Sequence, residues 1–279
     1  MTNITGFTFL STDGKTQLHA CLWIPDEKIK FRAVLQIAHG VAEHIERYDD
    51  FARYLNEQGI VVAGHDHLGH GGSIRTKADY GYFAQPDGNR AVLDDLHAVT
   101  ALTKQLYPGV PYFLLGHSMG GRAVSVYLKD SIKAAALWAP ADNTGLDGLE
   151  FLDHSAEGRQ AIYDGAIQNG VLDLPKWGVT ISADFVQQVA DQDPTASLRT
   201  YNGPLLLAYT AGDAELLSQT TIDLTRQAAA EHSGPLVDLT GQYEDATHNF
   251  TAASGKKIDD FSVRRRIESA TAEFFEEYL

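Results

Sequence analysis

The chain has 279 residues, of which 44% are hydrophobic and 21% charged, with one cysteine, Cys21. This composition is typical of a globular protein with a large core, and one cysteine excludes an internal disulfide framework, so Cys21 is expected as a buried thiol. The net charge of −15 argues against nucleic acid or anionic lipid as a partner. No apolar run approaches the ~18 residues of a membrane span, and the first residues do not resemble a signal peptide, so a cytoplasmic location is expected.

The chain is expected to open with an antiparallel hairpin and to continue as alternating strands and helices. Apolar runs and alternation predict strands, and apolar residues at helical spacing predict helices. The expected strands are 7–10, 18–24, 33–38, 60–64, 112–115, 134–138, 204–209 and 235–239. The expected helices are 49–57, 90–106, 122–129, 218–231 and 263–278. From residue 33 onward this alternation indicates an α/β fold whose parallel sheet has helices on both faces.

The alternation stops at residue 141 and resumes near residue 201, so residues 141–200 are expected to be an irregular, acidic insertion into a core of residues 1–140 and 201–279. The insertion follows a strand, so it should cover the carboxyl edge of the sheet, where open α/β sheets bind ligands. Its acidic residues would then repel anionic substrates at the entrance, or else only solvate the surface. Four aromatic residues of this cap are expected to line a pocket: Phe151, Tyr163, Trp177 and Phe185.

A strand, a sharp turn and a helix are predicted around Ser118. The segment Gly116-His117-Ser118-Met119-Gly120 has the pattern G-x-S-x-G and follows an apolar strand. This pattern in this context is typical of a nucleophile elbow, in which glycines allow a tight turn that exposes the serine hydroxyl. Ser118 is therefore the candidate nucleophile.

A serine hydroxyl needs a base within hydrogen-bond distance, and in elbow enzymes the order along the chain is Ser, then Asp or Glu, then His. Of the histidines after Ser118, His154 lies in the insertion and His232 ends a helix, whereas His248 lies in a loop beyond the last predicted strand. His248 is therefore the candidate base.

The acid should follow a strand between the serine and the histidine. Asp213 does so, and would orient the imidazole of the base. A helix N-cap is the structural alternative for Asp213. Glu244 and Asp245, close to the base in sequence, are rival acids.

Two backbone amides are expected to bind an oxyanion, those of Met119 after the nucleophile and of Val41 after the His39-Gly40 strand end. Three nearby histidines, His65, His67 and His70, could suggest a metal site, but no cysteine accompanies them and a packed loop is the simpler interpretation. No metal and no cofactor are expected.

Segments 39–48, 66–73 and 116–121 closely resemble the monoacylglycerol lipase and lysophospholipase group of the α/β-hydrolase superfamily. The resemblance implies an eight-stranded, mostly parallel sheet, the triad Ser118, Asp213 and His248, and oxyanion amides at Val41 and Met119. The insertion differs from the long helical lid of the lipases in this group. It is more similar to the small cap of bacterial cinnamoyl and feruloyl esterases.

The expected function is hydrolysis of small to medium carboxylic esters by a serine hydrolase, through an acyl-enzyme. Three alternatives stay open: a monoacylglycerol lipase or lysophospholipase, an aminopeptidase similar to proline iminopeptidase, and a non-catalytic binding protein on a hydrolase scaffold. The expected partner is a small-molecule ester, and the sequence does not indicate an oligomeric state.

Overall fold

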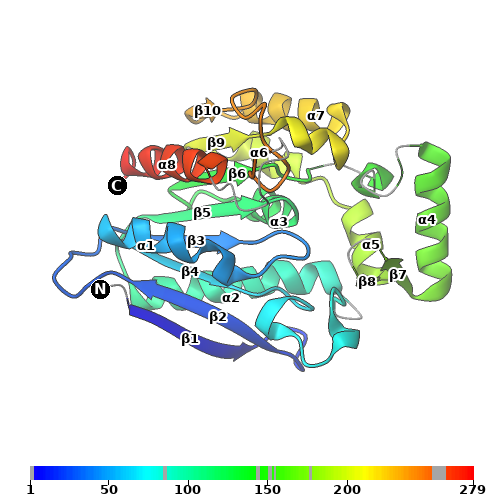
Figure 1. The fold of residues 1–279 in the computed structure, drawn as a ribbon, viewed down its shortest axis with the longest axis horizontal. Coiled ribbons are helices and arrows are strands. Elements are labelled where there is room, and N and C mark those ends of the chain that lie inside the picture. Colours follow the sequence, from blue (N-terminus) through cyan, green and yellow to red (C-terminus); the bar gives the residue numbers. More distant parts are fainter. Residues whose placement is uncertain are drawn as a thin grey trace.

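The computed structural model describes residues 3–83, 87–142, 145–149, 153, 155–175, 178–252 and 262–279. Its centre is an eight-stranded sheet flanked by helices (Figure 1). The strands are β1 (Asn3–Leu10), β2 (Gln17–Ile24), β3 (Ala33–Ala38), β4 (Ile60–His65), β5 (Tyr112–His117), β6 (Ala134–Trp138), β9 (Leu205–Ala208) and β10 (Leu236–Asp238). Their spatial order is β1-β2-β4-β3-β5-β6-β9-β10.

The sheet is antiparallel only at its first edge, where β1 pairs with β2 and β2 with β4. All pairs from β4 to β10 are parallel. The expected eight-stranded, mostly parallel sheet is therefore confirmed. Strands β3, β5 and β6 are buried at every position, because helices cover both faces of a parallel sheet.

Neighbouring side chains of β5 show how the two faces are covered. Phe113 stacks on Phe275 of α8, with ring centroids 4.7 Å apart, whereas the hydroxyl of Tyr112 contacts Thr103 of α2 on the opposite face. Alternate residues of a strand point to opposite faces, so α8 and α2 lie on different sides of the sheet. The helices of this layered core are α1 (Asp49–Glu57), α2 (Gly88–Leu106), α3 (Met119–Tyr127), α7 (Gln219–Glu231) and α8 (Ser262–Glu276).

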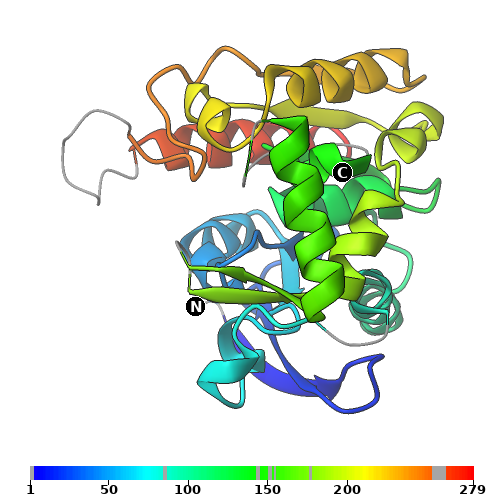
Figure 2. The same ribbon diagram turned by 90° about the vertical axis from the view of Figure 1, so that its right-hand side faces the viewer.

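Between β6 and β9 the chain forms regular elements, so the expectation of an irregular segment is wrong. These elements are α4 (Ala156–Asn169), β7 (Val171–Leu174), β8 (Val179–Ser182), α5 (Ala183–Ala190), α6 (Thr195–Thr200) and the 3₁₀ helix η4 (Gly145–Leu149). Figure 1 shows α4, α5 and the β7–β8 hairpin beyond the end of the sheet, and Figure 2 shows α4 running across the front of the core. Helix α6 instead packs against α3 and α7.

Helix α4 lacks the apolar periodicity that would have predicted it, because among its described residues only Ala166 is buried. The features of the sequence that indicate this helix are instead the capping residues at its two ends. The side chain of Ser155 accepts a hydrogen bond from the amide of Gly158, and Gly170 closes the helix at φ 76°. In the part of the chain that the structure describes, no helix is long and apolar enough to cross a membrane.

Candidate active site

Ser118 sits in a strained turn between β5 and α3. Its φ of 54° and ψ of −117° lie outside the regions that non-glycine residues prefer. The turn is tight enough to require glycine on both sides. A Cβ atom on Gly116 would collide with the carbonyl oxygen of Gly120, and one on Gly120 would collide with the carbonyl oxygen of Ala38. The expected strand, turn and helix are therefore present, with Ser118 at the tip.

The structure brings Ser118, His248 and Asp213 together in one hydrogen-bonded chain. Nε2 of His248 lies 2.9 Å from Oγ of Ser118, and Nδ1 of His248 lies 2.5 Å from Oδ1 of Asp213. The Asp213 side chain is fully buried, and that of His248 is 12% exposed. Buried away from water, the carboxylate can hold the imidazole in one tautomer, with its other nitrogen facing the serine hydroxyl.

Asp213 is not the N-cap of a helix, as the alternative interpretation had it: Thr210 is the N-cap of a short helix, and Asp213 is the third helical residue of its capping box. It lies in the 3₁₀ helix η5 (Ala211–Glu215), and its Oδ2 accepts a 2.5 Å hydrogen bond from the amide of Thr210 while Oδ1 faces His248. The rival acid Asp245 is exposed and forms an ion pair with Arg266 at 3.2 Å, away from the imidazole.

The loop after β3 approaches the serine closely. A Cβ atom on Gly40 would lie 3.1 Å from the Cβ of Ser118, a tighter contact than most side chains make, so glycine favours this close approach. Val41 and Met119 both line the cavity that Ser118 faces. Met119 is the first residue of α3, and amides at a helix N-terminus carry a partial positive charge.

The side chain of Glu43 braces this loop, a contact that the sequence analysis missed. Its Oε2 accepts hydrogen bonds from the amide of Gly40 at 3.0 Å and the hydroxyl of Tyr48 at 3.2 Å, and its Oε1 binds Nη1 of Arg47 at 2.6 Å. Arg47 in turn donates to the carbonyl oxygen of Asn249, beside the candidate base. The only hint in the sequence was the i, i+4 spacing of Glu43 and Arg47.

Glu43 also faces His117, the residue that precedes Ser118. Burial would raise the pKa of Glu43, but His117 at 3.0 Å, together with Arg47 and Arg264, lowers it well below its usual value. Nε2 of His117 donates to the carbonyl oxygen of His248 at 3.0 Å. The carboxylate therefore stays ionised and links the loop after β3 to the loop that carries His248.

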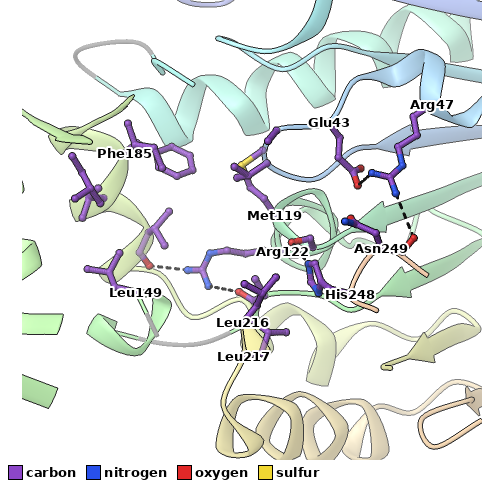
Figure 3. A pocket seen from close by; sticks show the side chains of 18 residues that line it. Glu43, Arg47, Met119, Arg122, Leu149, Phe185, Leu216, Leu217, His248 and Asn249 are labelled. Carbon is purple, nitrogen blue, oxygen red and sulfur yellow. Dashed lines mark hydrogen bonds and ion pairs between the residues drawn. The ribbon is translucent and has the colours of Figure 1, made fainter. Parts of the chain in front are cut away.

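The cavity beside Ser118 has a volume of about 250 Å³ and is lined mainly by apolar side chains (Figure 3). The segment between β6 and β9 supplies Leu149, Leu172, Ile181, Phe185, Val186 and Val189. No acidic residue of the cap is among the described residues that line it.

The expectation that four aromatic residues of the cap line the pocket holds for one of them. Phe185 lines the cavity and stacks on Phe83 with ring centroids 4.0 Å apart. Tyr163 lies half-buried on α4, against the apolar cluster beneath the cap, and does not appear among the described lining residues. Phe151 and Trp177 lie outside the described residues.

Arg122 connects the helix that follows Ser118 to the cap. Its Nη2 donates to the carbonyl oxygen of Val189 at 2.7 Å, and its Nη1 donates to that of Ala141 at 3.3 Å (Figure 3). Nη2 also donates to the carbonyl oxygen of Gln192 at 3.1 Å. These carbonyls lie at the end of α5 and just after β6. The guanidinium thus fixes α5 over the cavity.

The histidines near the elbow form a buried, closely packed group. His39, His65, His67 and His70 are fully buried, and burial lowers the pKa of His39 to about 3 and that of His70 to about 4. Nε2 of His39 accepts a hydrogen bond from the amide of His67, so His39 is the neutral Nδ1–H tautomer. The group thus packs as uncharged rings at the ends of β3 and β4.

Comparison with known proteins agrees with this architecture. A family model described as serine aminopeptidase, S33, matches residues 29–159. The monoglyceride lipase homolog of Monkeypox virus is 46% identical over 92 residues, which cover 32% of this chain and 30% of that protein. The monoglyceride lipase of Homo sapiens is 39% identical over 98 residues, which cover 32% and 28%. The chain thus matches less than a third of the length of these relatives.

The similarity in fold extends over the whole chain. The structure of Est1E from Butyrivibrio proteoclasticus with ferulic acid bound aligns with a TM-score of 0.68 and 19% identity, covering 98% of both chains. With its serine elbow at the carboxyl edge of a mostly parallel sheet, the chain has the α/β-hydrolase fold. Over part of its length the chain is similar in sequence to the monoglyceride lipases, as the sequence motifs implied.

Proposed function

We propose that the chain is a serine hydrolase that cleaves small to medium carboxylic esters through an acyl-enzyme. The observation that carries this proposal is the continuous hydrogen-bonded chain from Ser118 through His248 to Asp213, placed beside an apolar cavity. Such a chain activates a hydroxyl that is otherwise a poor nucleophile.

In this mechanism Oγ of Ser118 attacks the ester carbonyl while Nε2 of His248 takes the hydroxyl proton. Asp213 stabilises the imidazolium that forms. The tetrahedral oxyanion accepts hydrogen bonds from the amides of Val41 and Met119, and losing one such donor raises the barrier by about 3 kcal/mol. His248 then protonates the leaving alcohol and activates the water that releases the acid.

We assign residues 141–200 as the cap of this site and the remainder of the chain as its core. The apolar side chains of Leu149, Ile181 and Phe185 would contact the acyl group, and Arg122 would keep α5 in place over it. A cavity of about 250 Å³ suits a small or medium acyl chain.

A monoacylglycerol lipase is the second candidate, favoured by the names of the similar proteins and by a cavity that is apolar over the cap and polar at Glu43 and Arg47. The aminopeptidase alternative is named by the matching family model. It requires an available carboxylate for a substrate ammonium, and Glu43, the carboxylate in the described lining, already pairs with Arg47 and His117.

The test compares kcat/KM for p-nitrophenyl esters of increasing acyl length, for a monoacylglycerol and for an aminoacyl amide. Esters of short to medium acyl length should react fastest, and the amide slowest. In Ser118→Ala, kcat should fall on the order of 10⁶-fold in a protein with an unchanged circular dichroism spectrum. Turnover of the amide above that of the matched ester would instead support the aminopeptidase. No turnover of any substrate would support a binding protein.

A further inference from the structure

A second group of reactive side chains lies outside the described lining of the proposed active site, where β2 meets the turn before α1. His19 and Cys21 are two residues apart on β2, so both point to the same face of the sheet. Glu46 approaches them from the 3₁₀ helix η1 (Ile45–Tyr48). Each of the three side chains offers one ligand atom, and these atoms all lie within 4.8 Å of one another.

The two distances from His19 to the other ligand atoms match those of a tetrahedral zinc site. Nε2 of His19 lies 3.4 Å from Sγ of Cys21 and 3.8 Å from Oε1 of Glu46. With bonds of about 2.1 Å to nitrogen and 2.3 Å to sulfur, two ligands of one zinc ion lie about 3.6 Å apart. The side chain of Glu46 is 65% exposed, so it can adjust to a cation without disturbing the core.

The backbone around these ligands is already held in place. The amide of His19 donates to Oγ of Ser73 at 3.0 Å, and its carbonyl accepts from the amide of Asp66 at 2.8 Å. Oδ1 of Asp66 accepts from the amide of Ile45 at 2.6 Å, which fixes the start of η1 next to β2. The two ligands on β2, His19 and Cys21, therefore need little reorganisation to bind an ion.

We propose that His19, Cys21 and Glu46 bind a divalent cation of the zinc type. The ligand set of thiolate, imidazole and carboxylate selects zinc or cobalt over magnesium and calcium, which prefer oxygen ligands. On binding, the Cys21 thiol loses its proton to solvent and a sulfur–metal bond forms, while a water occupies the fourth position. The cation enters from the side of His19, which is 25% exposed, whereas Cys21 is 2% exposed.

The bound cation would join β2 to the turn that leads into α1. Glu46 precedes Arg47, which binds Glu43 beside the proposed oxyanion loop. A ligand that binds only the folded state raises its stability, so zinc should raise the Tm of the protein. This stabilisation does not depend on Ser118 or on any hydrolytic activity.

Titration of the metal-free, full-length protein with Co²⁺ tests the site directly. The chain has one cysteine, so a thiolate-to-cobalt charge-transfer band can arise only from Cys21. We expect this band in the wild type and its loss in Cys21→Ser. In His19→Gln and in Glu46→Gln the dissociation constant for Co²⁺ should rise roughly tenfold or more. His97→Gln and Glu27→Gln, which change exposed side chains elsewhere, serve as matched controls and should titrate like the wild type.

Two results would overturn the proposal. One is the absence of a thiolate band at saturating Co²⁺. The other is a band whose midpoint is the same in His19→Gln and Glu46→Gln as in the wild type. Because His19 and Glu46 are partly exposed, these two variants keep the test decisive if Cys21→Ser fails to fold, which circular dichroism would show. Zn²⁺ should compete with Co²⁺ at the same site and raise Tm in the wild type but not in His19→Gln.

Discussion

Oε1 of Glu43 lies 3.0 Å from Nδ1 of His117, and the opposite nitrogen of the same ring donates to the carbonyl oxygen of His248. His117 immediately precedes Ser118, and Oε2 of Glu43 accepts from the amide of Gly40. One buried carboxylate thus connects the three segments that would meet a substrate: the loop after β3, the elbow and the loop of the base. Glu43 lines the cavity, but both of its carboxylate oxygens are held by groups of the protein, so we expect Glu43 and His117 to act by positioning.

Replacing Glu43 by Gln should therefore lower kcat while the protein still folds. The amide keeps the shape of the side chain but removes the negative charge that faces His117 and Arg47, and breaking a buried ion pair costs about 3–5 kcal/mol. We expect kcat to fall roughly tenfold or more, because misplacing reacting groups acts mainly on the rate, and KM to change less. Kinetics on one p-nitrophenyl ester, with Tm measured in parallel, checks this.

Glu57→Gln is the matched control, since Glu57 is an exposed residue of α1. It should leave kcat, KM and Tm unchanged. A Glu43→Gln variant that loses stability but keeps the wild-type kcat would show that the carboxylate supports the fold and does not position the base.

Asp213→Asn and Asp245→Asn form a second matched pair. Asparagine at 213 cannot hold the imidazole in the required tautomer, so kcat should fall by a few orders of magnitude, on the order of 10⁴-fold. Asp245 is exposed and paired with Arg266, and exposed ion pairs contribute little, about 0–1 kcal/mol. Its replacement should leave kcat within about twofold. The reverse ranking of the two variants would assign the acid to Asp245.

The cap variant Val186→Phe should shift acyl-chain preference toward shorter esters. Val186 is buried on α5 and lines the cavity, so a larger side chain reduces the space for the acyl group. The ratio of kcat/KM for a long ester to that for acetate should fall. Tyr163→Phe on α4 is the control, because Tyr163 lies outside the described lining. An unchanged ratio in Val186→Phe would show that the acyl group lies elsewhere.

The sequence predicted the core well because its signals are local. The strands 33–38 and 134–138 and the helix 49–57 agree with β3, β6 and α1 residue for residue, since continuous apolar runs and a clear amphipathic period mark them. Helix α4 was missed, because an exposed helix that buries only Ala166 among its described residues has no such period.

The sequence also predicted the three residues of the hydrogen-bonded chain, because a turn pattern and the order of elements along the chain point to them. It could not predict the contacts of Glu43 with His117, or of Arg122 with the end of α5. These contacts join segments that only the tertiary structure brings together. The acidic composition of the cap likewise did not reveal which of its side chains face the cavity.

The buried histidines make stability depend on pH. The folded-state pKa values of His39, His65, His67 and His70 lie below the usual 6.5, mainly because burial disfavours the charged ring. Below pH 6.5 the unfolded chain therefore binds protons that the folded chain cannot. The stability from these groups is fully present above pH 6.5 and is lost progressively as the pH falls through the folded-state pKa values, about 4 for His70 and about 3 for His39.

His65→Phe tests this dependence, because phenylalanine keeps an aromatic ring against Phe9 and removes one titrating group. Between pH 6 and 5, the slope of the unfolding free energy against pH should decrease by up to about 1.4 kcal/mol per pH unit relative to the wild type. Urea unfolding at several pH values measures it. His97→Phe, at an exposed position, should keep nearly the wild-type slope; equal slopes in all three proteins would contradict the account.

The most direct test of the proposed mechanism is covalent labelling with a fluorophosphonate, followed by intact-mass and peptide mass spectrometry. Only a serine activated by a neighbouring base reacts rapidly with this reagent. The hydrogen-bonded chain of Ser118, His248 and Asp213 predicts one adduct per chain, located on Ser118, absent in Ser118→Ala and formed far more slowly in Asp213→Asn. A folded wild-type protein that stays unlabelled, or that carries its adduct on another serine, would contradict the account.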